Sequence, residues 1–427
     1  MKSLFFFKKL SVVISALSLL LSACGPSPSA SIAKSDLQRV TAPDTPPADL
    51  QTLVDSNNAF AFDLYHSLQT HNGNMIYSPY SISLALAMTY AGAGGETESQ
   101  MAQSLHFLPQ DSLHPAFNAL DLQLAERGKG QSEEQTPLQL NIANAVWAEQ
   151  TYPFLQSFLD TIALHYGAGI RLADFINQYE AVRKEINNWV SDQTKDKIKD
   201  LIPEGVLDSD TRMALVNAIY FKADWLAPFN ADSTQDAPFH LLDGSEVSVP
   251  MMNQDTFIPY ATGDGWQAIE LAYQGETAAM DIIVPDEGRF EEVESSLDYE
   301  TASAVLSSLQ PTSVTLALPK FKFESEFGLA DQLRALGMPD AFDPDKADFS
   351  GMSDRDALYI SAVIHKAFVA VDEKGTEAAA ATAVIVGVTS APMFDVTLTI
   401  DRPFIFLIRD LPTGQILFIG RVLNPAQ

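Results

Sequence analysis

Apolar residues recur at helical spacing through the first half of the chain. Within residues 50–69 they fall three or four positions apart, on one helical face: Phe60, Leu64, Tyr65 and Leu68. Residues 79–90 are apolar around most of the circumference, which predicts a buried helix that begins near Ser78. Similar patterns predict four more helices, over 97–105, 113–127, 152–165 and 178–193.

Beyond residue 210 the pattern changes to short runs of β-branched and aromatic residues, which are typical of strands. These runs cover 213–221, 279–284, 313–323, 358–371, 396–400, 404–408 and 417–422. Helices followed by strands indicate an α+β fold. Because nothing within residues 50–427 repeats or has the composition of a second linker, we predict one large domain there.

The composition is that of an ordinary globular protein, and the charge narrows the choice of partners. Of 427 residues, 46% are hydrophobic and 19% charged, which excludes a disordered, collagen-like or coiled-coil chain. Acidic residues outnumber basic ones by 55 to 26, so the formal net charge of −29 argues against nucleic acid and against direct attraction to anionic lipid. A single cysteine excludes an intramolecular disulfide and a multi-thiolate metal site.

The N-terminal residues have the features of a secretory signal: three lysines, an apolar run over 10–21 and small residues before Cys24. This ending resembles a bacterial lipobox, which implies a lipoprotein signal peptide over 1–23 and lipidation of Cys24; an ordinary signal with an incidental cysteine is the alternative. The Pro- and Ser-rich residues 24–49 predict a flexible tether. Since Gly25 resembles the residue at this position in outer-membrane lipoproteins, we expect a secreted protein, lipid-anchored to the bacterial envelope, facing the periplasm or the cell surface.

Motifs of the common enzyme classes are missing from the sequence. It contains no Gly-x-Ser-x-Gly, no His-Glu-x-x-His, no phosphate loop and no Gly-x-Gly-x-x-Gly after a strand. The seven histidines include no pair at helical ligand spacing. We therefore expect no catalytic residues, no metal and no cofactor, with an unrecognised hydrolase as an alternative.

Residues 373–390 combine conflicting local preferences. Glutamate and alanines over 373–383 favour helix, whereas the β-branched run over 384–390 favours strand. Such a conflict is typical of functional segments, although a short surface helix leading into a strand is the plain alternative.

This string resembles the hinge of the serpin reactive-centre loop, with Gly375 as the pivot. Other segments resemble serpins in the same order: NAFAFDLY from 58, SPYSISLALAM from 78, NIANAVW from 141, NNWV from 187, LVNAIYFKADWLAPF from 215, AVIHK from 362 and DRPFIF from 401. The resemblance implies helices around three β-sheets, an exposed loop, and suicide inhibition of a protease that cleaves the loop and is trapped when the loop inserts as a strand. A serpin-fold surface protein that binds a partner without trapping a protease is the alternative.

The hinge residues fit insertion, because every second residue of a strand faces the same side. Thr376, Ala378, Ala380 and Thr382 would face the core together and all are small, which favours an inhibitor. The full hinge comprises Glu373, Gly375, Thr376, Glu377, Ala378, Ala379, Ala380, Ala381 and Thr382.

By resemblance, counting from Gly375 places the scissile bond at Thr389–Ser390, to within one or two residues. The neighbouring residues include no Lys or Arg, so elastase-like or subtilisin-like serine proteases fit better than trypsin-like ones, with cysteine proteases as a further option. We expect a monomer that partners this protease and, through its lipid, a membrane.

Two smaller groups of residues complete the resemblance. The shutter beneath the opening sheet would comprise Ser78, Ser81, Asn217 and His365, although each alone is more often a satisfied core polar group. The breach at the top of the sheet would comprise Lys320, Trp225 and Glu373, whose ion pair, if exposed, contributes below about 1 kcal/mol. Because the 95–127 region holds few basic residues, we expect no heparin binding.

Overall fold

The computed structural model describes residues 31–127, 138–355, 358–376 and 395–427. Within them the six predicted helices are confirmed to within a few residues, and three short helices that the pattern did not predict follow later in the chain. The helices are α1 (Pro47–Leu68), α2 (Pro79–Tyr90), α3 (Gly95–Ser104), α4 (Gln110–Ala125), α5 (Gln156–Tyr166), α6 (Phe175–Gln193), α7 (Phe290–Ser296), α8 (Tyr299–Ser308) and α9 (Ala330–Ala335).

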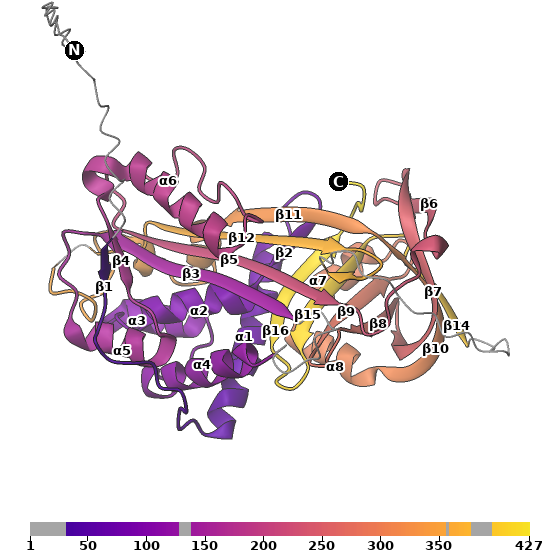
Figure 1. Ribbon diagram of the computed structural model, residues 1–427, viewed down its shortest axis with the longest axis horizontal. Coiled ribbons are helices and arrows are strands. Elements are labelled where there is room, and N and C mark those ends of the chain that lie inside the picture. The colour runs from indigo at the N-terminus through magenta and orange to yellow at the C-terminus, as the bar shows by residue number, and fades with distance from the viewer. Residues whose placement is uncertain (1–30, 128–137, 356–357, 377–394) are drawn as a thin grey trace, which may run out of the picture. The chain divides into compact units, whose positions relative to one another are not determined.

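A seven-stranded sheet, here called the main sheet, runs the length of the domain (Figure 1). In spatial order its strands are β1 (Ser31–Ala33), β4 (Ile170–Ala173), β3 (Gln139–Glu149), β5 (Met213–Asp224), β13 (Gly375–Thr376), β12 (Ala362–Val371) and β11 (Phe321–Gly328). Strands β5 and β12 pair directly and in parallel from Ala214 to Tyr220, and the two residues of β13 lie between them beyond that point.

The second sheet contains nine strands. These are β14 (Val396–Thr399), β10 (Gln310–Pro319), β7 (Glu246–Gly263), β8 (Trp266–Ala272), β9 (Ala278–Pro285), β15 (Phe404–Asp410), β16 (Ile416–Val422), β2 (Met75–Tyr77) and β6 (Gln235–His240), the last paired only with β7. Counted by hydrogen bonds, the described residues form two sheets where three were expected, because the 18-residue strand β7 continues from one group of strands into the next.

The predicted strand over 313–323 is divided into β10 and β11. Pro319 ends β10, and the backbone N–H of Lys320 donates to the carbonyl of Pro250 at 2.9 Å as the chain passes to the main sheet. Because proline has no N–H to donate to a neighbouring strand, we expect the strand to end at this position.

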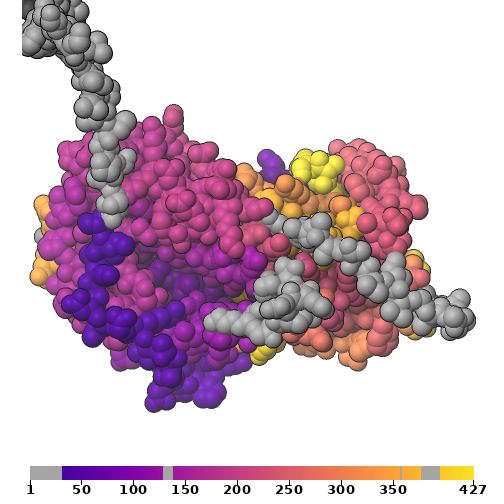
Figure 2. All heavy atoms as spheres, viewed as in Figure 1, coloured from indigo at the N-terminus to yellow at the C-terminus, as the bar shows by residue number. Residues whose placement is uncertain are grey.

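The predicted tether over 24–49 is wrong for the part that the structure describes. Residues 31–33 form β1 on the edge of the main sheet, and α1 already begins at Pro47. Between them, Ser35 donates to Asp160 at 2.6 Å and Arg39 pairs with Asp121 at 2.7 Å. In Figure 2 this indigo segment runs over the surface of the domain. These partners lie 82 to 141 positions further along the chain, which local composition does not reveal.

Helix α2 occupies the core, and all twelve of its residues are buried, as predicted. It packs against β3 and β5 of the main sheet and against β16 of the second sheet. Helix α6 covers the opposite face of the main sheet at β3 (Figure 1). The N-terminus of α2 therefore lies directly beneath the central strands, where polar side chains of the sheet can reach it.

Candidate functional site

Three polar residues lie side by side across the centre of the main sheet. Strand pairing aligns Asn144 of β3 with Asn217 of β5, and Asn217 with His365 of β12. Ser78, the N-cap residue of α2, and Ser81 in the first turn lie beneath this row. The structure thus brings together all four predicted shutter residues, and Asn144 joins them.

The cluster is held by a continuous chain of hydrogen bonds. The backbone N–H of Ser78 donates to His365 Nε2 at 3.1 Å, so Nδ1 carries the proton and donates to Asn217 Oδ1. The amide of Asn217 donates to Ser81 Oγ and to Asn144 Oδ1. Ser81 Oγ also donates to Asn144 Oδ1 at 3.0 Å. These bonds tie β3, β5 and β12 to one helix, so separating β5 from β12 must break at least the His365–Asn217 bond.

Burial determines the protonation state of His365. The side chain is fully buried, and this desolvation lowers its pKa from 6.5 to about 3. The neutral ring accepts from Ser78 and donates to Asn217, whereas a protonated ring has no acceptor for the Ser78 N–H. The hydrogen bond from Ser78 of α2 to His365 of β12 therefore forms only with a neutral imidazole.

The predicted breach residues meet at the top of the sheet. Trp225 donates from Nε1 to the carbonyl of Asp372 at 3.0 Å, and Lys320 Nζ pairs with Glu373 Oε2 at 2.8 Å. Thr234 donates to the other Glu373 oxygen at 2.8 Å. Burial alone would raise the pKa of Glu373, but the hydrogen bonds from Lys320 and Thr234 outweigh it and lower the pKa. The Glu373 side chain is 14% exposed and that of Lys320 is 36% exposed, so the pair is partly buried.

Two residues of the predicted hinge, Gly375 and Thr376, lie within the main sheet as β13. Gly375 pairs with Asp224, and Thr376 pairs with Ala223 on one side and Val371 on the other. A Cβ added to Gly375 would lie 2.1 Å from the carbonyl oxygen of Ala223, so only glycine allows this approach.

Thr376 is buried among aromatic side chains beneath the top of the sheet. It is 1% exposed, and its hydroxyl hydrogen-bonds with that of Tyr273 at 2.6 Å. Tyr273 in turn stacks on Trp225 with ring centroids 4.6 Å apart. The first inward-facing hinge residue therefore occupies a completed pocket.

Several predicted residues lie outside the described part of the chain. These are Cys24, the hinge residues Glu377, Ala378, Ala379, Ala380, Ala381 and Thr382, and the predicted scissile residues Thr389 and Ser390. No group of three or more metal-ligating side chains occurs among the described residues, and no described helix is long and apolar enough to span a membrane.

Asn144, Thr234 and Tyr273 were not predicted from the sequence. Asn144 lies in a segment that resembled serpins, and an asparagine flanked on both sides by alanine and a branched apolar residue was a usable signal. The sequence around Thr234 and Tyr273 contains no motif that marks them, and only the tertiary structure brings them to the site.

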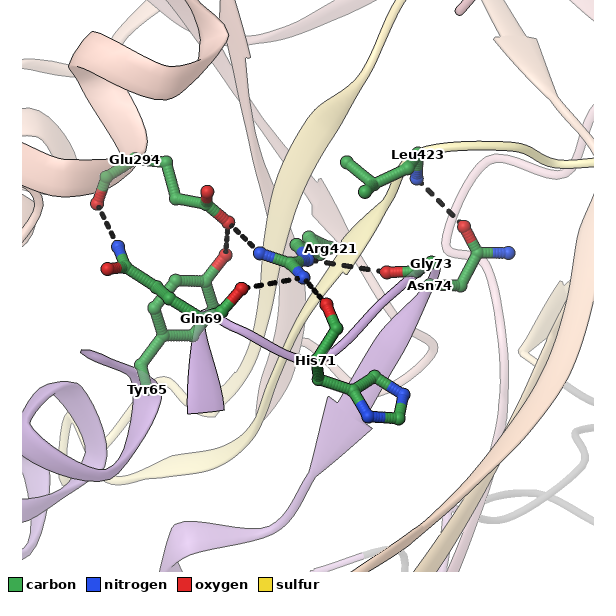
Figure 3. Close-up of polar contacts among 8 residues, drawn as sticks. All are labelled: Tyr65, Gln69, His71, Gly73, Asn74, Glu294, Arg421 and Leu423. Carbon is green, nitrogen blue, oxygen red and sulfur yellow. Dashed lines mark hydrogen bonds and ion pairs between the residues drawn. The ribbon is translucent and has the colours of Figure 1, made fainter. Parts of the chain in front are cut away.

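A further polar cluster lies around Arg421 of β16 (Figure 3). The guanidinium pairs with Glu294 at 2.6 Å and donates to the carbonyls of Gln69, His71 and Gly73. The hydroxyl of Tyr65 donates to the same Glu294 oxygen at 2.8 Å. These contacts hold the loop between α1 and β2, and β2 leads directly into Ser78.

A sheet that holds Gly375 and Thr376 between two strands, above a polar cluster that links the same strands, is typical of the class of proteins that take a loop into a β-sheet as an added strand. The chain belongs to the serpin family: the family model described as Serpin (serine protease inhibitor) matches residues 55–425.

Similar proteins cover nearly the whole domain. The leukocyte elastase inhibitor of Xenopus laevis is 39% identical over 385 residues, 88% of this chain and 100% of that protein. An uncharacterized serpin-like protein of Thermococcus kodakarensis is 42% identical, with 87% and 86% covered. Among solved structures, the native state of the thermophilic serpin tengpin matches with a TM-score of 0.81 at 31% identity, covering 92% of this chain and 99% of that one. Human thyroxine-binding globulin complexed with thyroxine matches with a TM-score of 0.78 at 32% identity, with 88% and 99% covered.

Proposed function

We propose that this serpin inhibits serine proteases by a suicide mechanism. A protease cleaves the loop at Thr389–Ser390, remains attached as an acyl-enzyme, and is carried away as the loop inserts between β5 and β12. The observation that carries the proposal is the position of Thr376, buried between these two strands and in register with both. Insertion then continues from an existing first step.

The strand pairing supplies a driving force for insertion. Strands β5 and β12 are parallel to each other over seven residue pairs, while β13 is antiparallel to both. A loop that continues from Thr376 would replace this one parallel ladder with two antiparallel ladders, which are slightly more stable per residue and twice as numerous. Each added backbone hydrogen bond contributes about 1 kcal/mol net. The predicted small residues of the hinge would fill the inward positions without steric conflict.

The proposed targets are elastase-like or subtilisin-like enzymes, with cysteine proteases as a second group. The predicted scissile region offers small and β-branched residues and no cation for a trypsin-like pocket. The relative from Xenopus laevis is named a leukocyte elastase inhibitor, which agrees with this choice. The chain acts without catalysis, because each inhibitor molecule is consumed.

The proposal is tested by mixing the purified domain with elastase-like, subtilisin-like and trypsin-like enzymes. We expect complexes that survive denaturing electrophoresis with the first two, and sequencing of the released C-terminal peptide identifies the cleaved bond. The nicked domain should melt at a higher temperature than the intact domain. A nicked domain that melts at the same temperature or lower would contradict insertion.

We also propose that the mature chain is a monomer anchored to the bacterial envelope through lipid on Cys24. The signal-like residues 1–23 and the position of the only cysteine support this. The test is membrane fractionation of cells that express the wild type or Cys24→Ala. Equal membrane recovery of both would refute the anchor.

The alternative is a serpin-fold surface protein that binds a partner without trapping a protease. The solved complex of thyroxine-binding globulin with thyroxine documents such ligand binding on this fold. The inserted Thr376 favours the inhibitor, because a protein that never admits its loop has no need of a glycine at 375 and a small buried residue at 376. Absence of covalent complexes with every protease tested would favour the alternative.

A further inference from the structure

A regular outward-facing surface lies on strands β7, β10 and β14, directly beyond the reactive-loop region. We call it the outer face. Across it, three rows of aligned residues point away from the core because their neighbours along each strand point inward. Its members are Asp395, Thr397, Thr399, Ser313, Thr315, Ala317, Phe257, Asp255 and Asn253.

The outer face is polar and acidic except at the small Ala317 and the large Phe257. Phe257 is 70% exposed, the largest exposed fraction among the large hydrophobic side chains of the described residues. Its aligned neighbour is Ser313, and the row ends at Asp395, whose N–H donates to the Ser313 carbonyl at 3.1 Å. Asp255 lies on β7 two residues before Phe257, and its carboxylate accepts from Thr315 of β10 at 2.8 Å. The nine residues include two carboxylates and no Lys or Arg.

From this arrangement we propose that the outer face is a docking surface for the target protease, with Phe257 as its apolar anchor and the two aspartates selecting a cationic enzyme. The proposal deepens the proposed function and rests on it. A lone exposed aromatic side chain amid polar residues is typical of an interface anchor, since aromatic residues contribute most of the binding energy where they enter a pocket of a partner.

The short stretch of chain between the predicted scissile bond and the outer face indicates that the partner bound there is the protease. The predicted scissile residue Ser390 precedes Asp395 by five residues, so the bond lies within about 17 Å of that residue. Phe257 is two strands from Asp395, about 10 Å across the sheet. A protease of about 230 residues has a radius of about 22 Å. A protease that binds the predicted scissile bond is therefore large enough for the surface around its active site to contact the outer face.

The charge of the chain supports the same occupant. The formal net charge of −29 attracts a cationic enzyme at long range, and the carboxylates of Asp255 and Asp395 direct it to the outer face. Such steering raises the rate of association and weakens with salt.

The test uses a cationic leukocyte elastase with wild type, Phe257→Ala, Asp255→Asn and the control Val206→Ala. Val206 is 44% exposed but lies before β5, at the end of that strand opposite the hinge. We expect Phe257→Ala to slow the second-order inhibition about fivefold with an unchanged number of inhibitors consumed per enzyme. Asp255→Asn should weaken the salt dependence of the rate, and Val206→Ala should change neither.

Binding of elastase whose active-site serine is replaced by alanine provides the second readout. Phe257→Ala should raise the dissociation constant by the same factor, because docking precedes chemistry. Wild-type complexes with unchanged Phe257→Ala rates would overturn the docking surface and leave the proposed function standing. If Phe257→Ala converted a dimer to a monomer and changed nothing else, the docking surface would also be overturned, since the outer face would then bind a second copy of this chain. If wild type traps no protease, both proposals fall together.

Discussion

Replacing Thr376 with arginine tests the link between the inserted hinge and inhibition. The native side chain is 1% exposed and bonds the hydroxyl of Tyr273, so an arginine at this position has too little space and loses its contact with water. Burying an unpaired charge costs several kcal/mol, which exceeds what the two residues of β13 contribute at about 1 kcal/mol per hydrogen bond. We expect the hinge to leave the sheet while the domain stays folded.

The same charge then obstructs insertion after cleavage. Each 1.4 kcal/mol added to the barrier slows insertion tenfold, so about 3 kcal/mol slows it more than a hundredfold, and deacylation releases active protease first. Thr376→Arg should therefore be cleaved as a substrate. The assay is the stoichiometry of inhibition together with denaturing electrophoresis against an elastase-like enzyme.

The matched control is Thr376→Ser, which keeps the hydroxyl that bonds Tyr273 at nearly the same volume. It should retain inhibition at a stoichiometry close to that of wild type. Stable complexes from Thr376→Arg at wild-type stoichiometry would refute the reasoning, because the loop would then have inserted with a charge in the core.

Three further perturbations probe other parts of the site. Because the pKa of His365 is lowered to about 3, its contribution to stability is complete above pH 6.5 and is lost as the pH falls. In urea titrations the free energy of unfolding of His365→Gln should therefore fall less steeply between pH 6.5 and 5 than that of wild type, by up to about 1.4 kcal/mol per pH unit. Equal slopes for the two proteins would contradict this. Gly375→Ala should remove hydrogen-exchange protection at the Thr376 amide, whereas Gly328→Ala, whose added Cβ meets no atom within 4 Å, should leave it intact. Arg421→Met should destabilise the domain by about 3–5 kcal/mol in urea unfolding, since Glu294 is left buried and unpaired; a loss as small as that from breaking the exposed Arg289–Glu292 pair would show that the buried pair is not needed.

The long helices were predictable because their apolar stripes or continuous apolar surfaces are properties of consecutive residues. Helix α2 is the clearest example, since a run from Pro79 to Tyr90 without polar periodicity already required burial on all sides. Helices α7 and α9 span seven and six residues, too few for a helical period to be recognised. Strand β13 has two residues and exists only because β5 and β12 flank it.

The predicted site residues were found through resemblance, and the structure adds what resemblance does not contain. Which hydrogen bonds link Ser78, Asn217 and His365, and that Asn144 completes the row, depends on the register of three strands. The tether prediction was wrong beyond residue 30 because Ile32 and Arg39 belong to a segment of polar, Pro-rich composition that is stabilised by distant partners.

The cluster around Arg421 has a consequence for the order in which the polypeptide is completed. Ribosomes deliver α1 and β2 some 350 positions before β16, yet the loop between α1 and β2 has its carbonyls satisfied by the Arg421 guanidinium. Until that late strand emerges, these early residues lack their partner, so the growing chain is held back from a finished structure. For the exported chain that we propose, such a delay would maintain the unfolded form that a translocation pore accepts.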